Sequence, residues 1–147
     1  MKIFSDTSSL FKLYHKEIGT EEFEKLFTSL KITAIFLSEI TKVEFTSTIW
    51  KKVRTKEISE LEAQTTLELF ETDLAKYTFI PTDSIIIEQA RFLISKYGKQ
   101  GLRTLDSIQF STAISLFNHA EIFLTDDKLL KFLFEAEGLP TKPPSNT

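Results

Sequence analysis

Cysteine is absent from this 147-residue chain, and histidine occurs only twice. The lack of cysteine excludes disulfides, thiolate nucleophiles and cysteine-ligated zinc. It also fits a reducing compartment, so we expect a cytoplasmic protein. His15 and His119 are the two histidines, and this small number disfavours a histidine-rich metal site or a Ser-His-Asp triad.

Long apolar runs are also missing. The longest uninterrupted runs are a few residues, far short of the roughly 20 that a membrane-spanning helix needs. Residues 1–6 do not resemble a signal peptide, so we expect no membrane association. The net charge of −3 argues against a nonspecific nucleic-acid coat. It is compatible with a nuclease, because bound divalent cations reverse the local sign of an acidic pocket.

Glycine and proline are scarce, with four of each, whereas phenylalanine occurs 14 times. Few helix breakers among apolar-periodic stretches favour a helix-rich fold. The length favours a single domain, which we place at residues 1–138. Three of the four prolines fall after it, and residues 139–147 are expected to form a Pro-rich C-terminal tail.

Short strands alternate with helices along the chain. The expected strands are Lys2–Ser5, Ala34–Leu37, Thr78–Ile80 and Glu121–Thr125. The expected helices are Thr7–Lys16 (ended by Gly19), Glu21–Leu30, Ser38–Arg54 (capped by Ser38), Glu60–Lys76 (capped by Ser59), a helix through Tyr97 (capped by Thr82 or Asp83 and closed by Gly98), Leu102–Asn118 and Asp126–Ala136. This alternation predicts parallel strands joined by crossover helices in an α/β sandwich.

Four acidic residues lie beside apolar runs at separate breaks in this pattern: Asp6, Glu44, Asp106 and Asp127. A carboxylate in an apolar setting is costly unless it is paired, protonated or bound to metal. If the four converge, they make an oxygen-lined cation site. Hard oxygen ligands without histidine or cysteine suit Mg²⁺ or Mn²⁺ rather than zinc.

Two of these acids, Asp6 and Asp127, follow expected strands. Ligands of open α/β sheets bind beyond the carboxyl ends of the strands. A structural role is equally available, because Asp6 can cap the next helix, as can Asp127 or its neighbour Asp126.

The other two acids lie on expected helices. Glu44 falls within the apolar stripe expected to face the core (Ile40, Val43, Ser47 and Trp50). Its alternative role is a buried salt bridge or a side chain that reaches out to solvent. Asp106 lies on a helix that is apolar nearly all round, and its alternative role is a capping box with Gln109.

Four segments together resemble the motifs of the PIN domain, specifically the stand-alone VapC-type toxin ribonucleases of type II toxin–antitoxin pairs. The segments are Ile3–Leu10, Leu37–Glu44, Leu102–Ile108 and Phe123–Leu130. They match a strand followed by Asp-[Ser/Thr], a second motif ending in an acid, Leu-Arg-x-x-Asp, and Thr-x-Asp-x-x-Leu. The last motif selects Asp127 over Asp126. The resemblance runs from Ile3 to about Gly138.

This resemblance implies a PIN-like α/β/α sandwich with a short central parallel sheet. It also implies a Mg²⁺- or Mn²⁺-dependent endoribonuclease that hydrolyses RNA phosphodiester bonds. Asp6, Glu44 and Asp106 would be the principal metal-site carboxylates, and Asp127 would complete the pocket. Thr7, Ser8 and Thr125 are candidates to hydrogen-bond the carboxylates, or else cap helices and form turns.

Basic residues form two groups, Lys51–Lys56 and Lys96–Arg103. Arg103, three residues before Asp106, is the best candidate to bind an RNA phosphate. The Lys51–Lys56 group is interpreted as a solvated face at a helix C-terminus.

The resemblance further implies a cognate antitoxin and a homodimer. Phenylalanines 11, 23, 27, 70 and 134 could serve either interface or simply enlarge the core. Alternative functions are a PIN nuclease in RNA processing and a noncatalytic protein-binding PIN module, although the latter could dispense with the acids. A phosphatase with a strand-end aspartate is disfavoured, because Ser8 stands where one large class has a second aspartate.

Overall fold

A four-stranded parallel sheet organises the computed structural model, which describes residues 1–15 and 20–143. The strands are β1 (Lys2–Ser5), β2 (Ala34–Ser38), β3 (Thr78–Ile80) and β4 (Ile122–Leu124), in the order β3-β2-β1-β4. β1 is central, and Ile3 lies opposite Ile35 on one side and Ile122 on the other. The four expected strands and their parallel pairing are confirmed.

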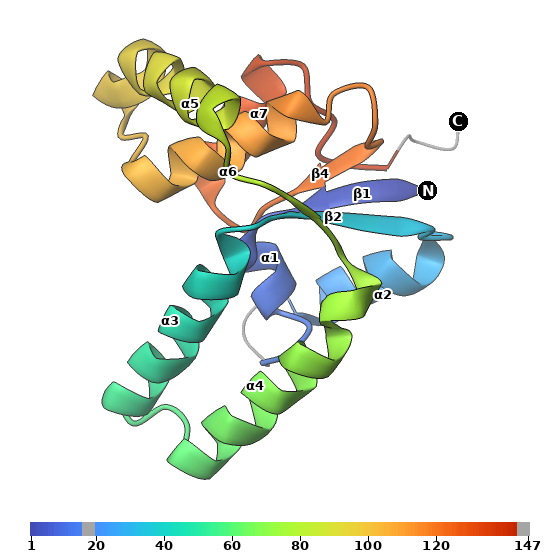
Figure 1. The fold of residues 1–147 in the computed structure, drawn as a ribbon. Coiled ribbons are helices and arrows are strands. Elements are labelled where there is room, and N and C mark those ends of the chain that lie inside the picture. Colours follow the sequence, from blue (N-terminus) through green and yellow to red (C-terminus); the bar gives the residue numbers. More distant parts are fainter. Residues whose placement is uncertain (16–19, 144–147) are drawn as a thin grey trace.

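Helices cover both faces of this sheet (Figure 1). They are α1 (Thr7–Phe11), α2 (Thr20–Ser29), α3 (Thr41–Arg54), α4 (Glu60–Asp73), α5 (Ser84–Tyr97), α6 (Thr104–Ser115) and α7 (Lys128–Ala136), with single 3₁₀ turns at Leu74–Lys76 and Gly98–Gln100. α1 to α4 lie on one side and α5 to α7 on the other, so the expected helix-rich α/β/α sandwich is confirmed. None of the helices described has the length and apolar character required to cross a membrane.

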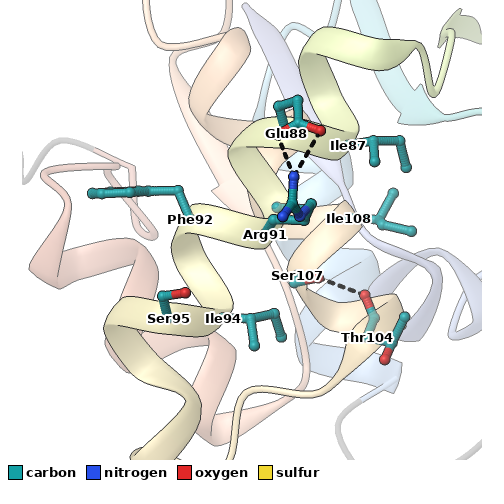
Figure 2. A pocket seen from close by; sticks show the side chains of 10 residues that line it. Ile87, Glu88, Arg91, Phe92, Ile94, Ser95, Thr104, Ser107 and Ile108 are labelled. Atoms are coloured by element: carbon teal, nitrogen blue, oxygen red, sulfur yellow. Dashed lines mark hydrogen bonds and ion pairs between the residues drawn. The ribbon is translucent and has the colours of Figure 1, made fainter.

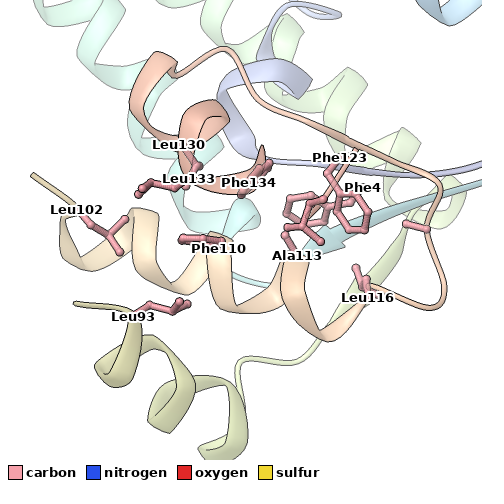
Figure 3. Close-up of a cluster of buried hydrophobic side chains, with 12 residues drawn as sticks. Phe4, Leu93, Leu102, Phe110, Ala113, Leu116, Phe123, Leu130, Leu133 and Phe134 are labelled. Atoms are coloured by element: carbon pink, nitrogen blue, oxygen red, sulfur yellow. The ribbon is translucent and has the colours of Figure 1, made fainter. Parts of the chain in front are cut away.

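Alternating strand side chains divide the core between the two faces. Phe4 and Phe123 project toward α6 and α7, where they meet Phe110 and Phe134 (Figure 3). On the opposite face Leu37 belongs to a second cluster with residues of α1, α3 and α4. The sheet is thus buried on both sides, as parallel sheets are.

The start of α3 differs from the prediction. Ser38 is fully buried at the end of β2, where it is paired with Ile80, and it does not cap the helix. α3 begins at Thr41, after Ile40, which makes no capping hydrogen bond through its side chain. The prediction was wrong because pairing with β3 carries the strand one residue beyond the apolar run.

Other helix boundaries also shift. α1 ends at Phe11 rather than Lys16, with turns following, and the expected positions of Lys16 and Gly19 lie outside the described residues. α4 stops at Asp73 before its 3₁₀ turn, and α6 is shorter than Leu102–Asn118 at both ends. Two caps are resolved as expected: Ser59 forms a capping box with Glu62, and Asp83, not Thr82, caps α5.

The chain remains packed beyond residue 138. Leu139 is only 1% exposed, and the carbonyl of Pro140 accepts a hydrogen bond of 2.8 Å from the amide of Phe123. Contacts with the core therefore extend past the boundary expected for the tail. The division into a domain of residues 1–138 and a tail of residues 139–147 stays a prediction.

Candidate active site

One pocket of about 360 Å³ lies where β1 and β4 end and α3 and α6 begin. Its lining includes all four acids singled out in the sequence, together with Thr7, Ser8, Phe11, Thr48, Lys52, Gln109 and Asp126. The amide of Asp6 donates to the carbonyl of Leu124, which joins the two strand ends beneath the pocket. The expected convergence of the acids at one edge of the sheet is therefore present as a shared pocket.

Asp6 is the most deeply buried of these acids, with 4% of its surface exposed. Oδ1 accepts from the Ser9 amide at 3.0 Å, which caps α1, and from the Ser8 hydroxyl at 2.8 Å. Oδ2 accepts from the hydroxyl of Thr125. Burial raises the pKa of Asp6 to about 6, although these hydrogen bonds oppose the rise. The helix-cap role and the pocket role thus belong to one side chain.

Glu44 lies at the border of the buried face of α3. That face consists of Thr41, Phe45 and Ile49, whereas Val43 is 72% exposed. The stripe expected from the sequence was therefore wrong, because packing against α1 and α4 turns Phe45 and Ile49 inward instead. Glu44 is half-buried, and burial raises its pKa, with a smaller contribution from repulsion by Asp106.

Hydrogen bonds from two other elements hold the Glu44 carboxylate. Gln109 Nε2 of α6 donates to Glu44 Oε1 at 2.7 Å, and the Thr7 hydroxyl of α1 donates to the same oxygen at 3.0 Å. Gln109 Nε2 also lies 3.1 Å from Thr41 Oγ1. This network links three elements that are far apart in the sequence.

Asp106 occupies the first turn of α6 and is half-buried. The N-cap of this helix is Arg103, without a side-chain hydrogen bond, and Gln109 points to Glu44 instead. The capping-box alternative is therefore wrong. Burial raises the pKa of Asp106, repulsion by Asp127 raises it further, and Arg103 opposes both.

Asp127 and Asp126 have different partners. Asp127 caps α7 through a hydrogen bond of 2.7 Å from the Leu130 amide to Oδ1. Asp126 pairs with Lys12, whose Nζ lies 3.2 Å from Oδ1. Capping thus falls to Asp127, which also lines the pocket beside Asp106.

The three polar residues expected to bind the carboxylates each make such a hydrogen bond. Ser8 and Thr125 bind Asp6, and Thr7 binds Glu44. Thr125 Oγ1 also accepts from the Asp127 amide at 3.1 Å. The structure shows the contacts of these three residues with the acids. That they support a metal site stays a prediction.

The acidic lining fits a hard divalent cation by its chemistry. The four side chains offer only oxygen atoms. Like-charge repulsion links Asp6 to Glu44, Glu44 to Asp106 and Asp106 to Asp127, and a bound cation would relieve it. As placed, no three acidic or histidine side chains in the described part of the chain come close enough to hold a metal ion together. Binding would have to draw the carboxylates inward.

Lys52 and Gln109 are among the lining residues that were not predicted from the sequence to belong to the site. Lys52 had been assigned to a solvated face, yet it enters the pocket, with its ammonium 2.8 Å from Glu57 Oε2. The signal was the four-residue spacing of Glu44, Thr48 and Lys52 on one helix face. Gln109 follows Asp106 by three residues and lies on the same side of α6.

Arg103 lies at the rim. It is exposed and lines a neighbouring cavity of about 370 Å³ with Glu44, Thr104, Leu105 and Asp106. Lys96, from the same basic group, is paired with Glu137 at 2.8 Å. Arg103 is therefore the member of that group placed beside the acids.

A separate cavity of about 640 Å³ lies between α5 and α6. Figure 2 shows Phe92, Ile94 and Ile108 around it, with the Glu88–Arg91 ion pair at its edge. Its lining has no residue in common with that of the acidic pocket. We therefore exclude it from the active site.

A family model for the PIN domain matches residues 3–132. Similar solved structures include VapC20 of Mycobacterium tuberculosis, a Sarcin-Ricin loop cleaving toxin, with a TM-score of 0.71 and 15% identity over 97% of this chain and 99% of that one. FitAcB of Neisseria gonorrhoeae gives a TM-score of 0.71 and 17% identity over 99% of both chains. VapBC2 of Rickettsia felis, bound to a promoter DNA fragment, gives 0.62 and 17% over 99% and 100%. No curated protein matches the chain.

Proposed function

This chain belongs to the PIN-domain family, and on that premise we propose that it is a divalent-metal-dependent endoribonuclease. Its substrate would be RNA, and the reaction hydrolysis of a phosphodiester bond. The observation that carries the proposal is the pocket at the carboxyl edge of the sheet, whose lining includes Asp6, Glu44, Asp106 and Asp127.

Those four carboxylates would hold Mg²⁺ or Mn²⁺. When bound, the cation would polarise a phosphoryl oxygen and lower the pKa of a water for attack. The charge of the lining supports a cation requirement: five carboxylates against the single cation Lys52 would repel a phosphodiester without one.

Other side chains of the chain would orient the carboxylates and bind the RNA phosphates. Ser8, Ser9 and Thr125 orient the Asp6 carboxylate, and α6 carries Asp106 into the pocket from its first turn. Arg103 at the rim and Lys52 inside would contact phosphates on either side of the scissile bond.

We further propose that the chain is the toxin of a toxin–antitoxin pair in the cytoplasm, with an antitoxin and a second copy of itself as partners. Solved structures of similar fold include a toxin–antitoxin complex from Klebsiella pneumoniae, with a TM-score of 0.61 and 18% identity. Exposed apolar side chains near the cavity between α5 and α6 offer a protein-binding surface: Ile85, Phe92 and Leu105 are 76%, 64% and 51% exposed.

Three of the five phenylalanines singled out in the sequence do not supply that surface. Phe11, Phe70 and Phe134 are almost completely buried, so their role is in the core. The side chain of Phe23 lies outside the described residues, and Phe27 is half-buried beside the cluster of Ile3 and Ile122. Among the side chains that the structure describes, the exposed phenylalanines are instead Phe92, Phe117 and Phe132.

The test uses purified protein freed of any antitoxin, incubated with single-stranded and structured RNA in Mg²⁺, Mn²⁺ or EDTA. We expect cleavage that needs the cation and disappears in Asp6→Asn and Asp106→Asn. A folded wild type that neither cuts RNA nor binds a divalent cation would support a noncatalytic protein-binding module. Cleavage without growth arrest on expression would favour RNA processing over a toxin role.

A further inference from the structure

Gln109 is nearly completely buried, with 2% of its surface exposed, yet it lines the acidic pocket. Its Nε2 is surrounded by three oxygens: Glu44 Oε1 at 2.7 Å, Thr41 Oγ1 at 3.1 Å and Thr7 Oγ1 at 3.2 Å. An amide nitrogen has two hydrogens, so the short contact to the carboxylate takes one of them. The second is shared between the threonines.

Two donors of this network, Gln109 Nε2 and the Thr7 hydroxyl, point to the same oxygen, Glu44 Oε1. The Thr7 hydroxyl donates toward Glu44 Oε1 at 3.0 Å and toward Thr41 Oγ1 at 3.1 Å. Gln109 Nε2 donates to Glu44 Oε1 as well, at 2.7 Å. Both hydrogen bonds found for this carboxylate among the described residues fall on Oε1, which leaves Oε2 available to the pocket.

The opposite end of the Gln109 amide has no partner. Its Oε1 is buried and accepts no hydrogen bond in the described structure. An unsatisfied buried acceptor costs about 1–3 kcal/mol. Turning the amide over would exchange this cost for others, because the carbonyl would then face Glu44 Oε1 and the NH₂ group would take the position without a partner. The fold therefore keeps an unsatisfied carbonyl in order to present a donor to Glu44.

We propose that Gln109 is a positioning residue, which holds Glu44 Oε1 so that Oε2 faces the pocket for the divalent cation. The inference rests on the proposed function and adds to it a residue that does not itself touch the cation. A hydrogen-bond partner of a ligand typically contributes 10- to 100-fold in metal affinity or activity. Gln109 also joins the helix of Asp106 to that of Glu44, so it would set the separation of the two carboxylates.

The test compares Gln109→Met with Ser111→Ala. Methionine has a similar length and no donor, so it removes the hydrogen bonds while filling the space. Ser111 is a matched control: it lies on the same helix, is fully buried, and donates to the Ile86 carbonyl at 2.8 Å, away from the pocket. Mn²⁺ binding is measured by calorimetry, and folding by thermal denaturation in EDTA.

We expect Gln109→Met to bind Mn²⁺ 10- to 100-fold more weakly while remaining folded, and Ser111→Ala to bind it as the wild type does. The double variant Gln109→Met/Glu44→Gln should bind no more weakly than Glu44→Gln alone, because Gln109 acts through Glu44. Unchanged Mn²⁺ affinity in a folded Gln109→Met, or additive losses in the double variant, would overturn the inference.

Failure of the proposed function gives a different result. If the wild type itself binds no divalent cation and cuts no RNA, the function and the inference are both rejected. If the wild type binds Mn²⁺ and cuts RNA while Gln109→Met matches it, the function stands and only the positioning role is lost. A Gln109→Met protein that fails to fold in EDTA would assign Gln109 to structure and reject the inference.

Discussion

The hydroxyl of Thr125 donates a hydrogen bond to Oδ2 of Asp6, which joins the residues that follow β4 and β1. The same oxygen of Thr125 accepts from the amide of Asp127. One side chain therefore orients a buried carboxylate and the N-cap residue of α7.

Thr125→Val should raise the pKa of Asp6 above about 6. The hydroxyl stabilises the ionised carboxylate, and valine keeps the shape but not the donor. Carbon-13 NMR of the aspartate carboxyls in metal-free protein measures the pKa directly. Thr28→Val is the control, since the Thr28 hydroxyl donates to the exposed Lys25 carbonyl. An Asp6 pKa that stays the same or falls in Thr125→Val would contradict the assignment.

Asp6→Asn should stabilise the metal-free protein at neutral pH. The pKa of Asp6 rises from 3.8 to about 6 on folding, so protonation favours the folded state. The free energy of unfolding of the wild type therefore falls as the pH rises from 3.8 to about 6. The fall is up to roughly 3 kcal/mol, at 1.36 kcal/mol per pKa unit. Asparagine does not ionise, so the variant does not lose this stability. Its side-chain oxygen can still accept the hydrogen bond from the Ser9 amide.

Urea denaturation in EDTA between pH 4 and pH 8 measures this difference. The advantage of Asp6→Asn should be largest above pH 6 and disappear near pH 4. Added Mn²⁺ should stabilise the wild type and leave the variant unchanged. A variant that is less stable than the wild type at neutral pH in EDTA would refute the explanation.

Lys52→Met should weaken RNA binding, because Lys52 lies in the pocket and its neighbour Lys51 is exposed. Methionine keeps an apolar stem of similar length and removes the ammonium, which lies 5.4 Å from the centre of the Phe11 ring. Loss of one phosphate contact should reduce the salt dependence of binding by about one ion. Fluorescence anisotropy with RNA in the cleavage-deficient Asp106→Asn background measures both quantities. Equal effects of Lys51→Met and Lys52→Met would show that only general charge matters.

Phe45→Ala should destabilise the fold by about 3–5 kcal/mol. Phe45 is fully buried and stacks on Phe70 of α4, with ring centroids 4.0 Å apart. Val43→Ala, two residues away but on an exposed position, should change the free energy of unfolding by less than about 0.5 kcal/mol. Urea denaturation of the two variants tests directly which face of α3 is buried. A larger effect of Val43→Ala would restore the stripe expected from the sequence.

The strands and most caps could be predicted because their signals are local. Short apolar runs mark the strands, and Ser59 and Asp83 precede helices at the positions that capping requires. The start of α3 could not be predicted in this way. Pairing between β2 and β3 extends the strand through Ser38, and this pairing depends on residues about 40 positions away.

The residues of the candidate site likewise divide into those with a local sequence signal and those placed by distant parts of the chain. Asp6 and Asp127 were found because they directly follow apolar strands, and Asp106 because its helix is apolar around it. Glu44 was singled out through a stripe that proved wrong, since packing of Phe45 and Ile49 against α1 and α4 leaves Val43 at the surface. Lys52 and Gln109 carry no local signal strong enough to separate a pocket residue from an ordinary helix residue.

By itself the sequence determined the alternation of strands and helices, the oxygen-only chemistry of the acids and their order along the chain. These follow from side-chain chemistry and from periodicity over a few residues. Only the tertiary structure decided which helix faces turn inward, that Asp126 pairs with Lys12 while Asp127 caps α7, and that Gln109 reaches Glu44. Those outcomes depend on strand pairing and helix packing between residues far apart in the chain, where a shift of one residue changes the direction of every side chain.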